Sequence, residues 1–488
     1  MNAQAVAGPP LKAPSSPIVV KASSKRTASR LNADEGEEGI RLLQRLISFP
    51  TTSHAASQNG AYNDCAACLV AELTGAGIEY AHILPESLPN KPIVVGKVTG
   101  TDPQLPGILL NSHYDVVPAI EADWTVPAFE GLRRDGRVYG RGAQDMKCVC
   151  AQYIVALKFL IKSGRKMRRT VFLSFVPDEE IGGIDGMNVM MQSDWFHEHG
   201  GKVELALDEG LASEGDSYTV FYGERLPWFL FFDSTGNTGH GSRFIEGTAV
   251  SSAAQVLNKA LAFREQQRRL LHGLHADDAG CSHAVAAAAA AAAATSDPAT
   301  AGDVASPKNL GDVTSLNITV MQAGTVFPDG KAVMNVVPAS ARIGMDIRIS
   351  PLDEPGAVSS MLDAWCQEIN TQPGNSSAKV KWDFAWPCVQ DHVVTQLAAP
   401  DVSPWWERFR ATLLEEFGVA VSPAIFPAAT DSRFLRAHGY KALGFSPIRR
   451  SPIMLHENDE WLGEDIFLEG CEVYVAVIPS LANFVSEA

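Results

Sequence analysis

Residues 107–118 read GILLNSHYDVVP, an apolar run that ends in a histidine, an aspartate and a turn. A second apolar run, TVFLSFV at 170–176, follows a segment at 148–164 whose apolar residues recur at helical spacing before a glycine. Short, continuous apolar runs are typical of strands that are buried on both faces. The three segments therefore predict a strand, a helix and a strand, the repeating unit of a layered α/β domain.

The alternation continues on both sides of this unit. Further helices are expected at 39–47, 62–77 and 356–369, and further strands at 92–98, 203–207 and 441–446. After about residue 218 the pattern changes, with strands expected at 229–234, 315–322 and 341–349 and a long helix at 249–271. Because the first pattern returns near the C-terminus, we expect a smaller domain inserted into a larger one.

Four parts of the chain are expected: an extension at 1–37, the larger domain at 38–217 and 351–488, and the smaller domain at 218–350. The first 33 residues contain five basic residues and no acidic one, so a disordered solvated tail is predicted, with an organelle transit peptide as the alternative. Residues 273–311 are dominated by Ala, Asp, Ser and Thr, which predicts an exposed low-complexity insertion.

Composition excludes several classes of protein. The 488 residues include 40 Lys and Arg against 56 Asp and Glu, and this net charge of -16 argues against binding the phosphates of nucleic acid. With 46% apolar residues the chain is globular, and it has no apolar run of the length that crosses a bilayer. Eight scattered cysteines fit a reducing compartment, so we expect a cytoplasmic protein, with a plastid or mitochondrion as the alternative.

Histidine and acidic residues stand out near the ends of the predicted strands. They are His113 and Asp115 in HYDVVP, Asp145 in GRGAQDMK, Glu179 and Glu180 in PDEE, Asp208 in LDEG, and His456 in LHENDE. Such residues bind a divalent transition metal such as zinc when a position must stay open for water and substrate. Open α/β sheets build their sites beyond the carboxyl ends of the strands, so the pattern predicts a metal centre there.

Two metals that share one bridging carboxylate, with two further ligands each, need five protein ligands. Five are available: His113, Asp145, Glu180, Asp208 and His456. Glu179, beside Glu180, is then left to act as general base. Asp115, two residues from His113, suits a hydrogen-bond acceptor that fixes the imidazole tautomer. Each residue alone fits an ordinary surface or core position, so the inference depends on the joint pattern.

The joint pattern resembles the aminoacylase-1 family of dinuclear zinc hydrolases, from about residue 38 to 484. Further segments carry the resemblance: TGHGSRF (238–244), MNVVPA (334–339), SPWWERF (403–409), PAATDSRFLRAHG (427–439) and KALGFSP (441–447). The resemblance implies a central mixed β-sheet flanked by helices. It also implies that the smaller α+β domain is a lid that mediates formation of a homodimer.

The resemblance implies a role for each ligand position. His113 and Asp208 would bind one zinc ion, Glu180 and His456 the other, and Asp145 would bridge the two ions. The peptide bond after Asp145 would be cis.

The resemblance also implies roles around the substrate. Glu179 would be the general base for a water activated between the two zinc ions. His240 would reach the partner's active site and polarise the scissile carbonyl, with Asn335 nearby. Arg433 would bind the carboxylate of the substrate.

The implied activity is metal-dependent hydrolysis of N-acyl-L-amino acids to a carboxylate and a free L-amino acid, with two zinc ions per subunit. One alternative is a dipeptidase or carboxypeptidase that uses the same dinuclear site. A second is a metal-free scaffold whose alanine-rich insertion recruits a partner, and the complete set of ligand positions argues against it.

Overall fold

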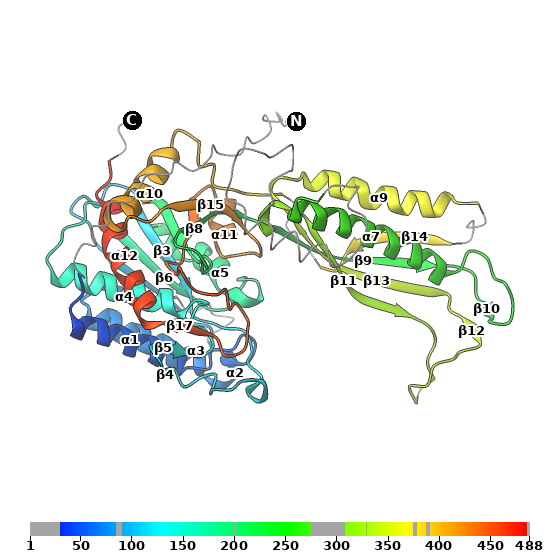
Figure 1. Cartoon of the computed structure of the whole chain (residues 1–488), viewed down its shortest axis with the longest axis horizontal. Coiled ribbons are helices and arrows are strands. Elements are labelled where there is room, and N and C mark those ends of the chain that lie inside the picture. Colours follow the sequence, from blue (N-terminus) through cyan, green and yellow to red (C-terminus); the bar gives the residue numbers. More distant parts are fainter. Residues whose placement is uncertain are drawn as a thin grey trace. The chain divides into compact units, whose positions relative to one another are not determined.

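The structure, a computed structural model, describes residues 30–83, 90–199, 202–274, 308–327, 329–373, 378–386 and 391–485. The chain forms two compact units (Figure 1). The smaller unit is Arg225–His392, and the larger unit comprises the described parts of Ser24–Glu224 and Val393–Ala488. Within the described residues, no helix combines the length and apolar character that crossing a membrane requires.

The larger unit is built on an eight-stranded sheet in the order β1-β2-β6-β3-β7-β16-β8-β15. Strands β6, β3, β7 and β16 run parallel to one another, whereas β1 with β2, β2 with β6 and β16 with β8 pair antiparallel. The sheet is therefore mixed, as expected. Its strands are β1 (Glu79–Ile83), β2 (Ile93–Val98), β3 (Gly107–His113), β6 (Val171–Val176), β7 (Val203–Asp208), β8 (Tyr218–Glu224), β15 (Val421–Phe426) and β16 (Lys441–Gly444).

Helices cover both faces of this sheet, which explains the continuous apolar runs in the sequence (Figure 1). Every residue of β3 and of β6 is buried. One face packs against α3 (Ala61–Gly75), α4 (Lys147–Lys162), α10 (Ser403–Phe417) and α12 (Glu464–Ala482). The other face packs against α5 (Met187–Gln192), α6 (Asp194–His199) and α11 (Ser432–Ala437). Strands buried on both sides have no polar face, so they do not alternate.

The expected N-terminal extension ends earlier than predicted, because helix α1 spans Ala33–Ile47. The Asn32 side chain accepts a hydrogen bond from the Glu35 N–H, and the Glu35 side chain accepts one from the Asn32 N–H. This capping box satisfies backbone donors that a helix start leaves free. Residues 33–37 are therefore helical, while residues 1–29 of the expected extension lie outside the described residues.

A three-stranded sheet lies beside the main sheet of the larger unit. It consists of β4 (Leu132–Arg134), β5 (Arg137–Tyr139) and β17 (Trp461–Gly463), in the order β17-β5-β4. Because β5 and β17 pair antiparallel, the chain just after β5 lies next to the chain just before β17. The short helix α2 (Ala56–Asn59) completes the unit.

The smaller unit has a four-stranded antiparallel sheet in the order β11-β13-β9-β14, with α7 and α9 packed on one face. Residues of β9 alternate between buried and half-buried because only one face is covered. Its elements are β9 (Leu226–Thr235), β10 (Gly239–His240), α7 (Ala249–His272), β11 (Ser315–Ala323), β12 (Val336–Val337), β13 (Ser340–Ile349), α9 (Pro355–Thr371) and β14 (Lys379–Phe384).

The domain boundaries differ from those expected at 218 and 350. Strand β8 pairs with β15 and β16, so residues 218–224 belong to the larger unit. Helix α9 and strand β14 belong to the smaller unit, because β14 pairs with β9. A helical apolar pattern does not indicate which sheet the helix covers, and this is why the helix near 356–369 was assigned wrongly. Of the expected insertion at 273–311, residues 275–307 lie outside the described residues.

Candidate metal centre

Three parallel strands end at one edge of the main sheet and bring polar residues there. His113 is the last residue of β3, the Glu179–Ile181 turn follows β6, and β7 ends at Asp208. Strand β3 pairs with β6 on one side and β7 on the other, so these ends are neighbours. The sheet edge therefore assembles residues that are far apart in sequence.

Two further residues reach this edge on loops. Asp145 lies just before α4, in the loop that follows β5, and its peptide bond to Met146 is cis, as expected. His456 lies in the loop that precedes β17, with φ at 61°. The pairing of β5 with β17 places these two loops side by side.

Asp145 lies between the two imidazoles. Its Oδ1 is 3.1 Å from Nε2 of His113, and its Oδ2 is 3.5 Å from Nε2 of His456. On the far side of His456, Oε2 of Glu180 is 3.0 Å from the same nitrogen. Ligand atoms of His113, Asp145 and Glu180 all lie within 4.8 Å of one another. Four of the five expected ligands therefore lie in one cluster: His113, Asp145, Glu180 and His456.

Asp208, the fifth expected ligand, faces away from the imidazoles. Its Oδ1 accepts a hydrogen bond from the Asn111 amide at 2.8 Å, and its Oδ2 accepts one from the Ser432 hydroxyl at 2.7 Å. The next residue, Glu209, lies at the cluster instead, with Oε2 3.4 Å from Nε2 of His113. Neighbouring side chains at a strand end point in opposite directions, so only one of two consecutive acids can face the cluster. At this strand end Glu209, and not the expected ligand Asp208, therefore faces the cluster.

Glu179 is buried at the same place. Ligand atoms of His113, Glu179 and Glu209 lie within 4.8 Å of one another. Burial, together with the charge of Glu209, raises the pKa of Glu179 well above its usual range. A carboxylate with a raised pKa, held close to a metal centre, is suited to accept and return a proton.

Asp115 connects the imidazole of His113 to the turn that carries the glutamates. Its Oδ1 is 3.3 Å from Nδ1 of His113 and accepts a hydrogen bond from the Glu179 N–H at 3.1 Å. Its Oδ2 accepts hydrogen bonds from the Glu180 N–H and from the Ser53 hydroxyl. Nδ1 of His113 also lies 3.1 Å from the main-chain carbonyl of Asp115, so this residue holds the ring and the backbone N–H groups of both glutamates.

The electrostatics of the cluster show an excess of negative charge. Burial and the charge of Asp145 raise the pKa of Glu180 to about 7, and burial also raises the pKa of Glu209. Hydrogen bonds to Asp145 and Glu180 raise the pKa of His456 to about 10. Four carboxylates with two imidazoles form a donor set that suits divalent cations, and cation binding would relieve this repulsion.

The PAATDSRF segment contributes residues beside the cluster. Asp431 is fully buried, and among the described residues neither of its carboxylate oxygens has a hydrogen-bond partner. A Cβ atom added to Gly183 would lie 2.5 Å from Oδ1 of Asp431 and 3.6 Å from Nη2 of Arg433. Both side chains therefore face the loop that follows Glu180. Asp431 lies in the motif PAATDSRFLRAHG but is not among the residues predicted for the site.

His240 and Asn335, the two remaining expected site residues, lie in the smaller unit. Strand β10 pairs with β12, and the Gly241 N–H donates to the Asn335 carbonyl at 2.8 Å. The backbone of Asn335 thus lies beside the turn that carries His240. The His240 side chain is exposed, and its Nδ1 lies 2.8 Å from the Ser242 hydroxyl.

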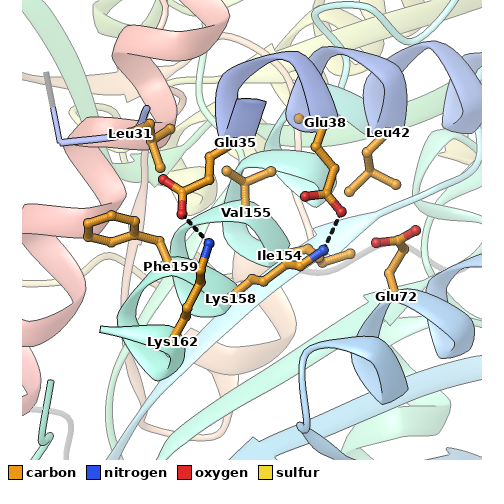
Figure 2. A pocket seen from close by; sticks show the side chains of 11 residues that line it. Leu31, Glu35, Glu38, Leu42, Glu72, Ile154, Val155, Lys158, Phe159 and Lys162 are labelled. Carbon is orange, nitrogen blue, oxygen red and sulfur yellow. Dashed lines mark hydrogen bonds and ion pairs between the residues drawn. The ribbon is translucent and has the colours of Figure 1, made fainter. Parts of the chain in front are cut away.

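A separate surface hollow lies between α1 and α4, away from the strand ends (Figure 2). It is a cavity of about 40 Å³, and two ion pairs, Glu35 with Lys162 and Glu38 with Lys158, cross it. None of the clustered ligands lines it, so it is not part of the metal centre.

The strand ends of this α/β sheet gather two histidines and four carboxylates, an arrangement that metal-dependent hydrolases use. A family model described as "Peptidase family M20/M25/M40" matches residues 109–480. This chain belongs to that family.

Individual relatives agree with this assignment. The chain is 40% identical to Aminoacylase-1 of Dictyostelium discoideum, over 80% of this chain and 86% of that protein. Human carnosine dipeptidase 1 has the same fold, with a TM-score of 0.64 at 14% identity, covering 92% of this chain and 97% of the other. The Bacillus subtilis YXEP protein, described as a dinuclear metal binding peptidase, superimposes with a TM-score of 0.59 at 14% identity, covering 93% and 99%.

Proposed function

We propose that this chain hydrolyses N-acyl-L-amino acids to a carboxylate and a free L-amino acid, using two zinc ions per subunit. One observation carries the proposal: the Asp145 carboxylate lies between two imidazoles, each of which contacts a second carboxylate. This arrangement suits two cations that share one bridging ligand. The similarity to Aminoacylase-1 over most of the chain supports the choice of substrate.

The distances favour one assignment of ligands. His113 and Glu209 would bind one ion, Glu180 and His456 the other, and Asp145 would bridge them. His113 has only Nε2 available for a metal, because its Nδ1 faces Asp115.

Zinc at this site would lower the pKa of a water molecule and polarise the carbonyl of the substrate. Glu179 would take the proton from that water as it attacks the amide carbon. The same carboxyl would then give the proton to the leaving nitrogen, so that the amine departs without negative charge. Burial of Glu179 keeps bulk water away from this proton transfer.

Arg433 is proposed to bind the carboxylate of the substrate. Arg433 is half-buried, and its Cζ lies over the Phe434 ring, 4.8 Å from the ring centroid. The ring restricts where the guanidinium can lie, and a guanidinium can bind a carboxylate through two N–H groups at once.

The smaller unit is proposed to serve as a lid and to mediate a homodimer. His240 would enter the partner's active site and polarise the scissile carbonyl, with Asn335 beside it. Exposed apolar side chains support an interface on this unit, since large exposed apolar groups mark contact surfaces. They are Phe244, Met321, Val326, Phe327 and Met334.

We further propose that the protein acts in the cytoplasm on small molecules. All six cysteines in the described residues are free thiols, which fits a reducing compartment. The alternative, import into a plastid or mitochondrion, depends on residues 1–29, which lie outside the described part.

A substrate panel tests the proposal directly. The purified protein would be assayed on N-acetylmethionine, on other N-acyl amino acids and on free-amine dipeptides, with and without a chelator. Turnover of the N-acyl compounds that is lost with chelator and regained with zinc is the expected result. Faster turnover of dipeptides would favour a dipeptidase, and activity unaffected by the chelator would contradict the metal centre.

A further inference from the structure

Two loops that each carry a proposed metal ligand are joined by buried contacts that the reaction itself does not use. The first loop, 140–145, ends at Asp145, and the second, 452–460, contains His456. They lie side by side because β5 and β17 pair, and the Gly140 N–H donates to the Glu460 carbonyl at 2.9 Å.

The side chain of Arg141 crosses from the first loop to the second. Its Nη1 donates to Oε2 of Glu460 at 2.9 Å and to the Glu457 carbonyl at 3.0 Å, and its Nη2 donates to the His456 carbonyl at 3.4 Å. The side chains of Arg141 and Glu460 are 3% and 0% exposed, so water does not compete for these contacts.

Glu460 makes the reverse connection, from the second loop to the first. Its carboxylate accepts hydrogen bonds from the N–H groups of Gly142 at 3.1 Å, Gln144 at 2.7 Å and Asp145 at 3.3 Å. A buried carboxylate is costly unless its lone pairs are satisfied, and here backbone donors and one guanidinium satisfy them. Glu460 thereby fixes the backbone up to the proposed bridging ligand.

His456 needs such support because its backbone is in an unfavourable conformation. Its φ of 61° lies in the left-handed region, which non-glycine residues rarely adopt. The hydrogen bonds from Arg141 to the carbonyls of His456 and Glu457 hold this conformation on one side of the loop.

A second connection keeps the rest of the loop in place. The Gln144 amide donates to the carbonyls of Pro452 and Trp461, and its oxygen accepts from the Met454 N–H. The loop therefore stays attached if the ion pair is lost. The effect of losing the pair should be local to His456.

We propose that Arg141 and Glu460 are positioning residues that set the distance between His456 and Asp145. This inference rests on the proposed function, because it assigns the pair to the ion bound by Glu180 and His456. The other ion shares Asp145 but takes its remaining ligands, His113 and Glu209, from the ends of β3 and β7, so it should depend less on the pair.

The test is zinc binding by the purified full-length protein, measured in competition with a chromophoric chelator. Glu460→Gln and Arg141→Lys should bind one zinc ion roughly 10–100-fold more weakly than the unmodified protein and should weaken the other ion, which shares only Asp145 with this site, to a smaller extent. Glu464→Gln is the matched control. It breaks the ion pair of Glu464 with Arg133, which joins β4 to α12 and touches neither loop, and it should bind both ions normally.

The double variant Arg141→Met with Glu460→Gln separates positioning from stability. It removes both buried charges, and the amide oxygen can still accept from a backbone N–H, so its thermal unfolding temperature without metal should lie above that of Glu460→Gln alone. Its second zinc ion should remain weakly bound. Recovery of that affinity in the double variant would overturn the inference.

Two further outcomes are distinguishable. If the unmodified protein binds fewer than two zinc ions, the proposed function itself fails. If it binds two, but the single variants bind both normally or lose both equally, then the proposed function stands and the positioning role is wrong.

Discussion

Asp115 lies behind His113, with Oδ1 of the aspartate 3.3 Å from Nδ1 of the imidazole. The same carboxylate accepts hydrogen bonds from the N–H groups of Glu179 and Glu180. The ring that presents Nε2 to the cluster and the turn that presents Glu179, the proposed general base, are therefore held by the same carboxylate. A change at Asp115 should affect metal binding and proton transfer together.

Replacing Asp115 by Asn should lower zinc affinity and turnover, each by roughly 10–100-fold, because the amide has no charge behind the imidazole and can accept through only one atom, whereas the carboxylate accepts through two. Zinc competition and steady-state kinetics would measure the two effects. Ser53→Ala, which removes only the hydroxyl that donates to Asp115, is the control and should have a much smaller effect. Equal losses of zinc affinity and turnover in the two variants would argue against the role of the Asp115 carboxylate.

Glu179→Gln should retain two zinc ions and lose turnover by roughly 10²–10⁴-fold, because the amide cannot accept the proton. Metal analysis combined with single-turnover kinetics would separate binding from chemistry. A variant with near-normal turnover would show that another group is the base.

Glu209→Gln and Asp208→Asn distinguish the structural from the sequence-based choice of ligand. We expect Glu209→Gln to weaken the binding of one zinc ion by roughly tenfold or more, since it removes a charged ligand atom near His113. Asp208→Asn should keep both ions and instead lower the unfolding temperature, because it disturbs buried hydrogen bonds. The reverse result would restore Asp208 as the ligand.

Zinc affinity should rise with pH from about pH 6 to about pH 10, because ligands must lose their protons to bind metal. The pKa of His456 is raised to about 10 and that of Glu180 to about 7, so the metal-free site holds protons at neutral pH. Calorimetry in buffers of different ionisation enthalpy should detect proton release on zinc binding. Affinity that is independent of pH would contradict this account.

The metal-free protein should also lose stability as pH rises from the unfolded-state pKa of histidine, about 6.5, towards the folded-state value for His456. The sign follows from the raised pKa, since the ion pairs of His456 with Asp145 and Glu180 require the protonated ring.

Mixing two inactive variants tests the proposed contribution of the lid to the partner's site. Chains with His240→Ala and chains with Glu179→Gln should regain activity after subunit exchange, because one site of each heterodimer is intact. With random pairing in a two-fold dimer, about one quarter of all sites should work. No recovery, despite exchange shown by mass spectrometry, would exclude the cross-subunit role.

Much of the fold followed from the sequence because strands buried on both faces are continuous apolar runs. Strand β3 has the expected bounds of 107–113, and β6 differs from its expected start by one residue. The choice between Asp208 and Glu209 could not be made in this way. Both are acidic, and periodicity does not show which of two residues beyond a strand turns towards the cluster.

The pairing of strands that are far apart in the chain also could not be predicted from the sequence. Strand β14 joins the smaller sheet through β9, more than a hundred residues earlier in the chain, and no local pattern indicates that partner. The Arg141–Glu460 contact is similar, since its two residues are ordinary charged residues until β5 and β17 bring them together. The proposed roles of His240, Asn335 and Arg433 stay predictions.

Asp208 faces away from the imidazoles, but its hydrogen bonds help to fix the register of the strands in the main sheet. It belongs to a row of polar groups across an otherwise apolar layer, in which the Ser174 hydroxyl donates to Asn111 and the Asn111 amide donates to Asp208. If any of these three strands shifted by one residue, the donors and acceptors of the row would lie among aliphatic side chains without hydrogen-bond partners. The row thus fixes the register of β6, β3 and β7, and with it how far the end of each strand extends towards the proposed metal centre.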